Sequence, residues 1–567
     1  MPIREFSSTG VPRAKIAFYQ ELPLASDLER FKERKYECVP CTIEDLQNPG
    51  FIALLDAVIF SQKPEKRNAL KPVMSAVIPL LLNNDVRVYV RIAWDPEKSI
   101  VARNLVIDTL LDLRVPLANI RREEWDRIPK ELREREVSNL APYVYIFDST
   151  ESWASVAHTV CDHPAGNAPN TELKFDGHDI QSLGQDGHAE RLMLLQRAFS
   201  NCHTLHLEKM TDGLSGAQVF KAYASQQPLV GGWKYDWPYL HLVKLGPRKK
   251  IVDEYDKYMG HALDYVPYHL GPKLRPDRCN LGSSQGILVG DFVEGTEAIR
   301  DSAPAGRAGH AIANLFDKTL GAWRKQAQPN IHRTLGQFLE GKWLDEDGNE
   351  ISLPQARANI VSKLGGTPVV TPLRAIFDRC SQSQVMSGPA HGDLHATNVL
   401  VRNGDAIIID FEKMEDEYPM LYDPASLEGG LLVEGFGRDP RSKNNPRKLL
   451  ESVTSLYTLK VLNSFVVPCH AANLSSWFYD CVGQIRTLSR HAVLSDDQYA
   501  LVLAVCLIRK GCNKHSFKLA NENLRAISFI IGHQILTQID QHFTQQISNG
   551  QAVERSKATH DQSQANS

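Results

Sequence analysis

Features that would place a chain in a special class are scarce in this sequence. Its 567 residues hold only 10 cysteines, too dilute for a disulfide framework, so we expect reduced thiols. Lys+Arg 64 against Asp+Glu 67 leaves a net charge of −3, without the single-signed excess of a general nucleic-acid or membrane-surface binder. No apolar run reaches the roughly 18 residues of a membrane span, and residues 1–10 are too polar for a signal peptide. We therefore expect a cytoplasmic protein with no membrane span and no nucleic-acid partner.

What is present is the composition of ordinary folded domains. Apolar residues make up 43% and charged residues 23% of the chain, and the length corresponds to about three or four domains. The final segment, 548–567, is rich in Gln, Ser and Asn. Because such a segment buries little apolar surface, we expect a disordered tail there.

The first 150 residues alternate short β-rich segments with amphipathic ones. The β-rich segments are 15–19 (KIAFY), 56–60 (DAVIF), 86–92 (VRVYVRI) and 143–147 (YVYIF). Between them, residues 68–82 and 99–113 carry apolar side chains at the three- and four-residue spacing of helices that cover a sheet. The alternation predicts an α/β domain with a parallel sheet over 1–150. The Gly- and Pro-containing segment 151–188 lacks a sustained period and is predicted to be a linker.

The most informative stretch is AHGDLHATNVLVRNGDAIIIDFE, at 390–412. Asp393 and Asn398 precede one apolar strand, and Asp410 follows the next. A tight hairpin through Asn403-Gly404 would bring these three side chains together. Phosphoryl transfer needs a carboxylate to orient the attacking hydroxyl and oxygen ligands to hold Mg²⁺ against the nucleotide phosphates. The three residues fit those roles.

HGDLHxxN, a short hairpin and an apolar strand ending in IDF together resemble the aminoglycoside and choline kinase group of the protein-kinase-like fold. The resemblance implies that Asp393 is the catalytic base and that Asn398 and Asp410 are the magnesium ligands. It also implies that His391 and His395 brace the loop. The implied fold is a bilobal α+β domain with a largely helical C-terminal lobe.

Upstream segments resemble the remaining parts of a kinase N-terminal lobe. TDGLSGAQVFKAY resembles the nucleotide loop, in which Gly213, Ser215 and Gly216 would approach the phosphates. Lys244 lies near the end of an apolar strand, where the resemblance implies the phosphate-neutralising lysine. Glu254 is the implied helix carboxylate that pairs with it, and Asp253 is a weaker candidate.

The two lobes of this implied kinase cover 189–295 and 296–547. GILVGDFVEG resembles the hinge, whose backbone groups would take up the adenine edge at Asp291, Phe292 and Val293. Asp423, in YDPASLEG, is expected to anchor a turn structurally.

These residues predict an ATP- and Mg²⁺-dependent phosphotransferase that transfers the γ-phosphate to a hydroxyl of an unidentified acceptor, either a small molecule or a protein. Acceptor selection is expected within 303–327 and 447–543. The acidic run Glu415-Asp416-Glu417 is a candidate to face a cationic substrate. The alternative is a nucleotide-binding pseudokinase that serves as a scaffold in a multi-protein signalling or effector system.

The N-terminal domain has the strand pattern of a flavodoxin-like or receiver-like fold. Gln20-Glu21 follows the first strand, and Ser61 stands where a receiver carries its phosphoacceptor aspartate. The resemblance therefore implies a domain without the phosphoacceptor that docks a protein partner or regulates the kinase domain. Cys38 and Cys41 have the CxxC spacing of a redox pair or half a zinc site, but no second pair appears, so idle thiols are the default reading.

Overall fold

The computed structural model of the chain divides into two compact units. The first comprises residues 1–256 and 273–293, and the second comprises 257–272 and 294–567. The residues that the structure describes are 15–33, 36–62, 70–92, 96–113, 115, 117, 121–128, 144–148, 150–162, 166–176, 183, 187–210, 217–226, 239–282, 284–292, 294–345, 347–439, 445–468, 476–514 and 519–565.

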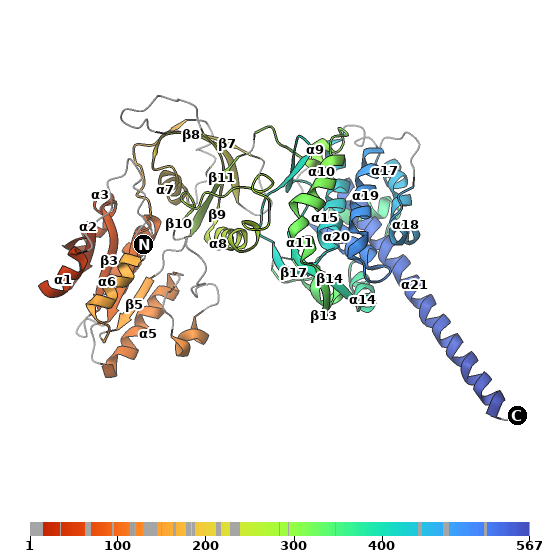
Figure 1. The fold of residues 1–567 in the computed structure, drawn as a ribbon, viewed down its shortest axis with the longest axis horizontal. Coiled ribbons are helices and arrows are strands. Elements are labelled where there is room, and N and C mark those ends of the chain that lie inside the picture. Colours follow the sequence, from red (N-terminus) through yellow and green to blue (C-terminus); the bar gives the residue numbers. More distant parts are fainter. Residues whose placement is uncertain are drawn as a thin grey trace. The chain divides into compact units, whose positions relative to one another are not determined.

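The first unit begins with a fully parallel sheet covered by helices (Figure 1). Its five strands have the order β2-β1-β3-β4-β5. Its strands are β1 (Lys15–Tyr19), β2 (Glu37–Cys41), β3 (Leu55–Gln62), β4 (Arg87–Ile92) and β5 (Val144–Asp148). Its helices are α1 (Ala25–Lys32), α2 (Ile43–Gln47), α3 (Pro49–Ile52), α4 (Leu70–Asn83), α5 (Pro96–Asp112) and α6 (Trp153–Asp162). The predicted parallel α/β domain is confirmed.

Alternate side chains of this sheet enter two different cores. Ala17 and Phe60 belong to the apolar cluster that α4 and α5 complete. Phe18 instead packs against Phe31 of α1 and Trp153 of α6, with ring centroids 5.8 and 6.0 Å away. Because successive residues of a strand point to opposite faces, one strand supplies both cores. Helices therefore cover both faces of the sheet.

The structure differs from the sequence-based expectation at two places in this region. The CxxC segment, which was not predicted to be regular, forms strand β2 at one edge of the sheet. The expected linker 151–188 contains α6 and the short strand β6. Helix α6 is held against the sheet by its first residue, Trp153, because the Trp153 ring packs against Phe18 of β1.

A second sheet of the first unit has six strands in the order β10-β11-β9-β8-β7-β6. The strands are β6 (Lys174–Asp176), β7 (Cys202–Lys209), β8 (Gln218–Gln226), β9 (Tyr239–Pro247), β10 (Asn280–Leu281) and β11 (Gln285–Asp291). Helix α7 (His188–Ala198) shares an apolar core with these strands, and α8 (Arg248–Lys257) follows β9 directly. Antiparallel pairing of β8, β9 and β11 positions Lys244 in a central strand.

Arg197 of α7 connects the two sheets of the first unit. Its side chain is fully buried, and it donates to the backbone oxygens of Asn83, at the end of α4, and Leu281, in β10, at 2.7 and 3.0 Å. Its guanidinium also lies 2.9 Å from the Asp85 carboxylate. A buried guanidinium needs such partners because an unpaired buried charge is costly.

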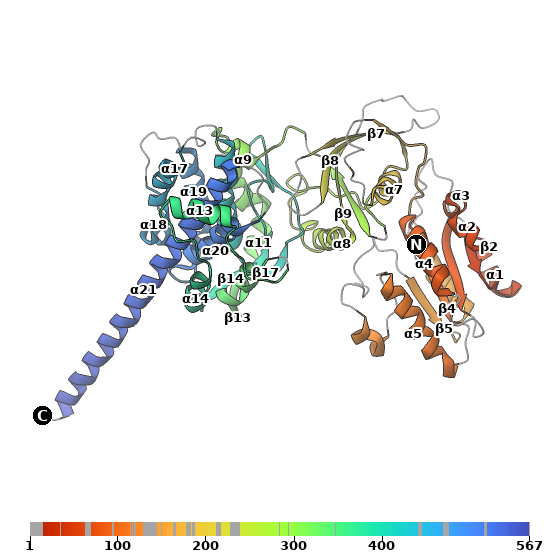
Figure 2. The ribbon, with the colours of Figure 1, turned by 180° about the vertical axis from the view of Figure 1, so that it is seen from behind.

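The second unit is largely helical, with two three-stranded sheets (Figure 2). The sheets are β12 (Glu297–Ala298), β15 (Val399–Arg402) and β16 (Asp405–Ile408), and β13 (Gln328–Thr334), β14 (Gln384–Ala390) and β17 (Glu415–Pro419). The helices before the second sheet's central strand are η5 (Tyr258–Ala262), α9 (Ile299–Ser302), α10 (Gly309–Asn314), η6 (Leu315–Thr319), α11 (Gly321–Lys325), α12 (Leu335–Leu339), η7 (Glu340–Trp343), α13 (Gln355–Lys363) and α14 (Thr371–Cys380). Those after it are α15 (Tyr422–Gly430), η8 (Leu431–Gly435), α16 (Phe436–Arg438), α17 (Pro446–Thr454), η10 (Ser455–Tyr457), α18 (Leu459–Ser464), α19 (Ser476–Ser489), η11 (Arg490–Ala492), α20 (Gln498–Cys512) and α21 (Leu519–Ala565).

The C-terminal residues depart from expectation, because α21 continues to Ala565 through most of the segment predicted to be a disordered tail. Figure 1 shows this end of α21 extending away from the other helices of the second unit. Of the helices that the structure describes, none combines the length and the apolar character of a membrane span.

Candidate functional site

The catalytic-loop segment predicted from the sequence lies between β14 and a tight hairpin. Strands β15 and β16 pair from Val399–Ile408 to Arg402–Asp405. The turn residues Asn403 and Gly404 have φ of 52° and 84°, the backbone of a type I′ turn. The predicted Asn-Gly hairpin is confirmed.

Asp423 of α15 anchors the start of this loop. Its buried carboxylate accepts the backbone N–H groups of His391 and Gly392 at 2.7 and 2.9 Å, as expected of a structural anchor. Burial raises the pKa of this carboxyl, although the two N–H donors act in the opposite direction. Gly392 has φ of 73°, and a Cβ there would lie 2.1 Å from the Lys413 carbonyl oxygen. The loop therefore requires glycine at this position.

Two hydrogen bonds join the loop to the strand that carries Asp410. The Ile409 N–H donates to the Asn398 carbonyl, and Nε2 of His391 contacts the Ile409 carbonyl, each at 3.0 Å. Asp410 follows directly, with φ of 70°. His391 thus braces the loop, as the resemblance implies. The backbone of Asn398 is bonded to Ile409, the residue before Asp410.

Asp393 presents its carboxylate to the surface of the loop, with 49% of its side chain exposed. Asn398 is buried, and its Nδ2 donates to the Asp393 carbonyl at 3.0 Å. Because this bond fixes the amide nitrogen as the donor, Oδ1 of Asn398 is left as an oxygen ligand. A carbonyl and a carboxylate oxygen, from Asn398 and Asp410, suit Mg²⁺, which takes one or two protein oxygens and completes its shell with water and phosphate.

His395 adds a charged network beside Asp393. Its Nε2 lies 3.7 Å from the Asp393 carboxylate, and its Nδ1 lies 3.4 Å from Glu434 of η8. Lys510 of α20 contacts Glu434 at 3.1 Å. Burial alone lowers the pKa of His395, but the carboxylates of Glu434 and Asp393 raise it above the usual value. Lys510 and His395 hold the pKa of Glu434 far below its usual range in spite of burial.

Lys342 of η7 lies on another side of the loop. Its Nζ is 3.4 Å from the Gly392 carbonyl and 4.4 Å from the ring centroid of Tyr422. Arg509 donates to the Lys342 carbonyl at 2.8 Å and so holds this turn. Burial, with the nearby Arg509 charge, lowers the pKa of Lys342 to about 8, although Asp393 opposes the shift.

Sequence reasoning did not find Glu434, Lys510 or Lys342. Glu434 lies on a π-helical turn far along the chain from the loop, and Lys510 lies on a helix further still. No spacing in the sequence connects these residues with Asp393. A π-helical turn next to a polar cluster is a structural signal of a functional site.

In the first unit, Lys244 and Glu254 form the ion pair that the resemblance implies. Nζ of Lys244 lies 2.6 Å from Oε2 of Glu254, and both side chains are about nine-tenths buried. Asp253, the weaker candidate, is half-buried on the same helix.

The expected nucleotide-contact residues are placed only in part. Asp291 ends β11, and its N–H donates to the Lys273 carbonyl at 2.8 Å. The Phe292 N–H donates to the Leu240 carbonyl at 3.3 Å. Both hinge donors therefore already have partners within the first unit. The remaining residues predicted to contact the nucleotide, Gly213, Ser215, Gly216 and Val293, lie outside the described residues.

Among the described residues, no group of three or more His, Cys, Asp or Glu side chains is arranged to hold a metal ion. Cys38 and Cys41 are free thiols, and burial raises their pKa values to about 11 and about 12. Neutral thiols of this kind are poor nucleophiles and poor ligands.

Residues 352–498 match a family model described as Ternary complex associated domain 9. No curated protein matches the chain. Among solved structures, the chain is similar to the aminoglycoside phosphotransferase APH(3'')-Id from Streptomyces rimosus, with 19% identity over 53% of this chain and 98% of that one and a TM-score of 0.27. It is also similar to a glucosamine kinase solved with glucosamine, ADP and inorganic phosphate, with 11% identity, coverage of 60% and 93%, and a TM-score of 0.30.

A choline kinase from Cryptosporidium parvum is a third similar structure, with 13% identity over 61% of this chain and 91% of that one and a TM-score of 0.24.

Proposed function

We propose that the protein is an ATP- and Mg²⁺-dependent phosphotransferase that transfers a γ-phosphoryl group to a hydroxyl. The observation that carries this proposal is the arrangement of the catalytic loop. An exposed carboxylate, Asp393, lies on a loop whose backbone also ties Asn398 to the residue before Asp410. Phosphoryl transfer relies on positioning and charge rather than on covalent chemistry by the protein. A loop that positions these oxygen-bearing groups therefore provides the kind of contribution that this reaction needs.

Each residue has a definite task in this mechanism. Asp393 orients the acceptor hydroxyl and receives its proton. Lys244, held by Glu254, binds the nucleotide phosphates. Asn398 and Asp410 would hold Mg²⁺, which supplies neutralising charge for the phosphates when it is bound. The nucleotide loop that carries Gly213, Ser215 and Gly216 completes the proposed nucleotide site. The hinge at Asp291, Phe292 and Val293 would contribute backbone groups other than the Asp291 and Phe292 N–H, which already have partners.

Paired substitutions test this mechanism. ADP production from Mg·ATP is measured with a panel of hydroxyl compounds that includes glucosamine and choline. Asp393→Ala should lower turnover by several orders of magnitude and leave nucleotide affinity nearly unchanged, because this side chain acts on the acceptor. Asp410→Asn should instead weaken Mg·ATP binding in calorimetry. Asp405→Asn, which removes an acid from the neighbouring hairpin, is the matched control and should retain turnover. Equal turnover in Asp393→Ala would contradict the proposal.

The second candidate is a pseudokinase that serves as a scaffold component. The specific observation in its favour is the family model that covers 352–498, whose description refers to a ternary complex. This candidate predicts nucleotide binding without ATP consumption for every acceptor in the panel. Transfer of radiolabel from ATP to a co-purified protein would instead show a protein acceptor.

We further propose that the N-terminal domain is receiver-like, lacks a phosphoacceptor, and docks a partner or regulates the kinase domain. Its strand order, β2-β1-β3-β4-β5, is the order of flavodoxin-like folds. Ser61 is fully buried within β3, in place of an exposed aspartate at the strand end. Incubation with acetyl phosphate should therefore leave this domain unlabelled, and an acyl phosphate found on one of its aspartates would overturn the proposal.

A further inference from the structure

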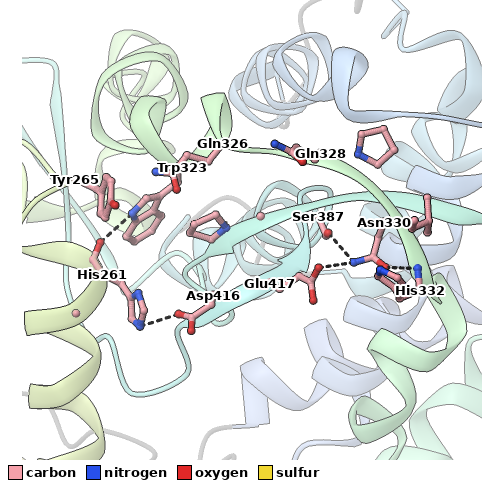
Figure 3. Close-up of a pocket in the computed structure, with 15 residues that line it drawn as sticks. His261, Tyr265, Trp323, Gln326, Gln328, Asn330, His332, Ser387, Asp416 and Glu417 are labelled. Atoms are coloured by element: carbon pink, nitrogen blue, oxygen red, sulfur yellow. Dashed lines mark hydrogen bonds and ion pairs between the residues drawn. The ribbon is translucent and has the colours of Figure 1, made fainter. Parts of the chain in front are cut away.

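The second unit contains a polar cavity of about 620 Å³, which we name the β13 pocket (Figure 3). It is lined by residues that follow α8, by the end of α11, and by all three strands of the β13-β14-β17 sheet. Pockets of roughly 300–1,000 Å³ are the usual size for small-molecule ligands. Asp393, Asn398 and Asp410 are absent from its lining, which reaches Pro389 near the end of β14.

A bulge in β13 creates this pocket. The register between β13 and β14 shifts between Pro329 and Thr334. Within this shift Ile331 is 71% exposed, while Asn330 turns inward and is 5% exposed. Bulges re-aim side chains and are concentrated next to functional sites. The shift thus brings the buried Asn330 into the pocket wall beside the exposed Ile331.

The buried Asn330 amide fixes the direction of a carboxylate. Its Oδ1 accepts the backbone N–H groups of His332 and Arg333 at 3.0 and 2.8 Å, so its Nδ2 is the donor end. That donor binds Ser387 at 3.0 Å and Glu417 at 2.6 Å. Figure 3 shows the amide pointing toward both groups. A neutral amide orients Glu417 but does not offset its negative charge.

The rest of the pocket lining is also acidic rather than basic. Asp416 contributes a second carboxylate, whose partner is Nε2 of His261 at 2.7 Å. The lining residues, all of which the structure describes, include neither lysine nor arginine. Trp323 and Tyr265 add aromatic surface, and Tyr265 is 41% exposed. Carboxylates beside aromatic rings form a favourable environment for an organic cation.

We propose that the β13 pocket binds a small organic cation, an amine or a guanidinium compound, at a site distinct from the proposed phosphoryl-transfer site. Glu417 supplies the oriented negative charge, and Asp416 the second. Trp323 and Tyr265 provide the apolar wall. His261 belongs to η5, which continues directly from α8, the helix of Glu254, so an occupant contacts the chain next to that helix.

The test uses the full-length protein in the absence of ATP, so that no ligand can be phosphorylated during the measurement. Putrescine is compared in calorimetry with butane-1,4-diol and succinate, which keep the four-carbon length but are neutral and anionic. Putrescine should bind, and the other two should bind at least about tenfold more weakly. Because putrescine has no hydroxyl to phosphorylate, its binding is independent of the proposed enzyme activity.

Two substitutions in the same strand locate the site. Glu417→Gln should weaken putrescine binding about tenfold. Glu415→Gln removes an equal charge from β17 outside the pocket lining and should bind putrescine as the wild type does. Putrescine should also slow backbone hydrogen exchange in 258–265 and 415–419 of the wild type, but not of Glu417→Gln. Equal binding of the diol or of succinate, or equal losses in the two variants, would overturn the proposal.

Discussion

Glu434→Gln should lower the pKa of His395, the histidine beside the proposed catalytic base. In the wild type, Nδ1 of His395 lies 3.4 Å from the Glu434 carboxylate. At an effective dielectric constant of about 20, two unit charges at that distance interact by about 5 kcal/mol. One pKa unit corresponds to about 1.4 kcal/mol, so this upper bound equals three to four units. Since 15% of the His395 side chain is exposed and solvent screens part of this interaction, we expect a fall of about one to two units.

The measurement is an NMR titration of the His395 ring in the intact protein. Lys510→Met is the control, because the Lys510 charge lowers the pKa of His395 and its removal should raise that pKa. The two variants therefore predict shifts of opposite sign. An unchanged pKa in Glu434→Gln, or shifts of the same sign in both variants, would refute this reasoning.

The same network predicts a pH dependence of stability. The folded-state pKa of His395 is raised, so its protonation stabilises the fold fully below the unfolded value of about 6.5, and this contribution is lost as the pH rises through the folded-state pKa. Glu434→Gln lacks the contribution. In urea denaturation, the loss of unfolding free energy relative to wild type should be larger at pH 6 than at pH 9.

Three further predictions concern other parts of the second unit. Asp423→Ala should lower the free energy of unfolding by about 2–4 kcal/mol in urea titrations, because two buried N–H groups lose their charged acceptor; an effect below the error of the titration would contradict the anchoring role. Arg486→Met should cost about 3–5 kcal/mol, since it leaves Glu428 buried without its bidentate partner, and Arg486→Met/Glu428→Leu should recover part of that loss. Lys342, with its pKa lowered to about 8, should change from ammonium to amine near pH 8 in an NMR titration of its side chain; a transition above pH 10 would argue against a lowered pKa.

The sequence was sufficient where structure depends on short-range pattern. Residues 15–19 form β1 as predicted, and the Asn403-Gly404 turn forms the predicted hairpin. Strand β2 was missed because ECVPC contains a proline, lies at a sheet edge and shows no apolar alternation. Residues 448–467 carry apolar side chains at helical spacing, but the structure divides them into most of α17 followed by η10 and α18. An apolar period therefore identifies a helical region without identifying its breaks.

The catalytic loop was accessible to sequence reasoning because its residues are close in the chain. Asn398 and Asp410 flank the β15–β16 hairpin, and the Ile409 N–H donates to the Asn398 carbonyl, so turn chemistry brings these two parts of the chain together. Glu434 and Lys510 reach the same loop from η8 and α20, and their contact depends on how the helices pack. Packing of distant helices leaves no local signature, which is why the charged environment of Asp393 could not be predicted.

In the N-terminal domain, too, the residues that determine the fold differ from the polar residues that would determine a function. Its parallel sheet follows from apolar strands whose side chains pack on both faces of the sheet. The polar positions at the strand ends differ from those of a receiver, because β3 carries the buried Ser61 and its register partner on β4 is Arg91. The Arg91 guanidinium lies 4.5 Å from the Trp153 ring centroid, so a cation occupies the place beside the position where a receiver keeps its acceptor carboxylate. The apolar packing that fixes the fold therefore does not determine which polar residues stand at the strand ends.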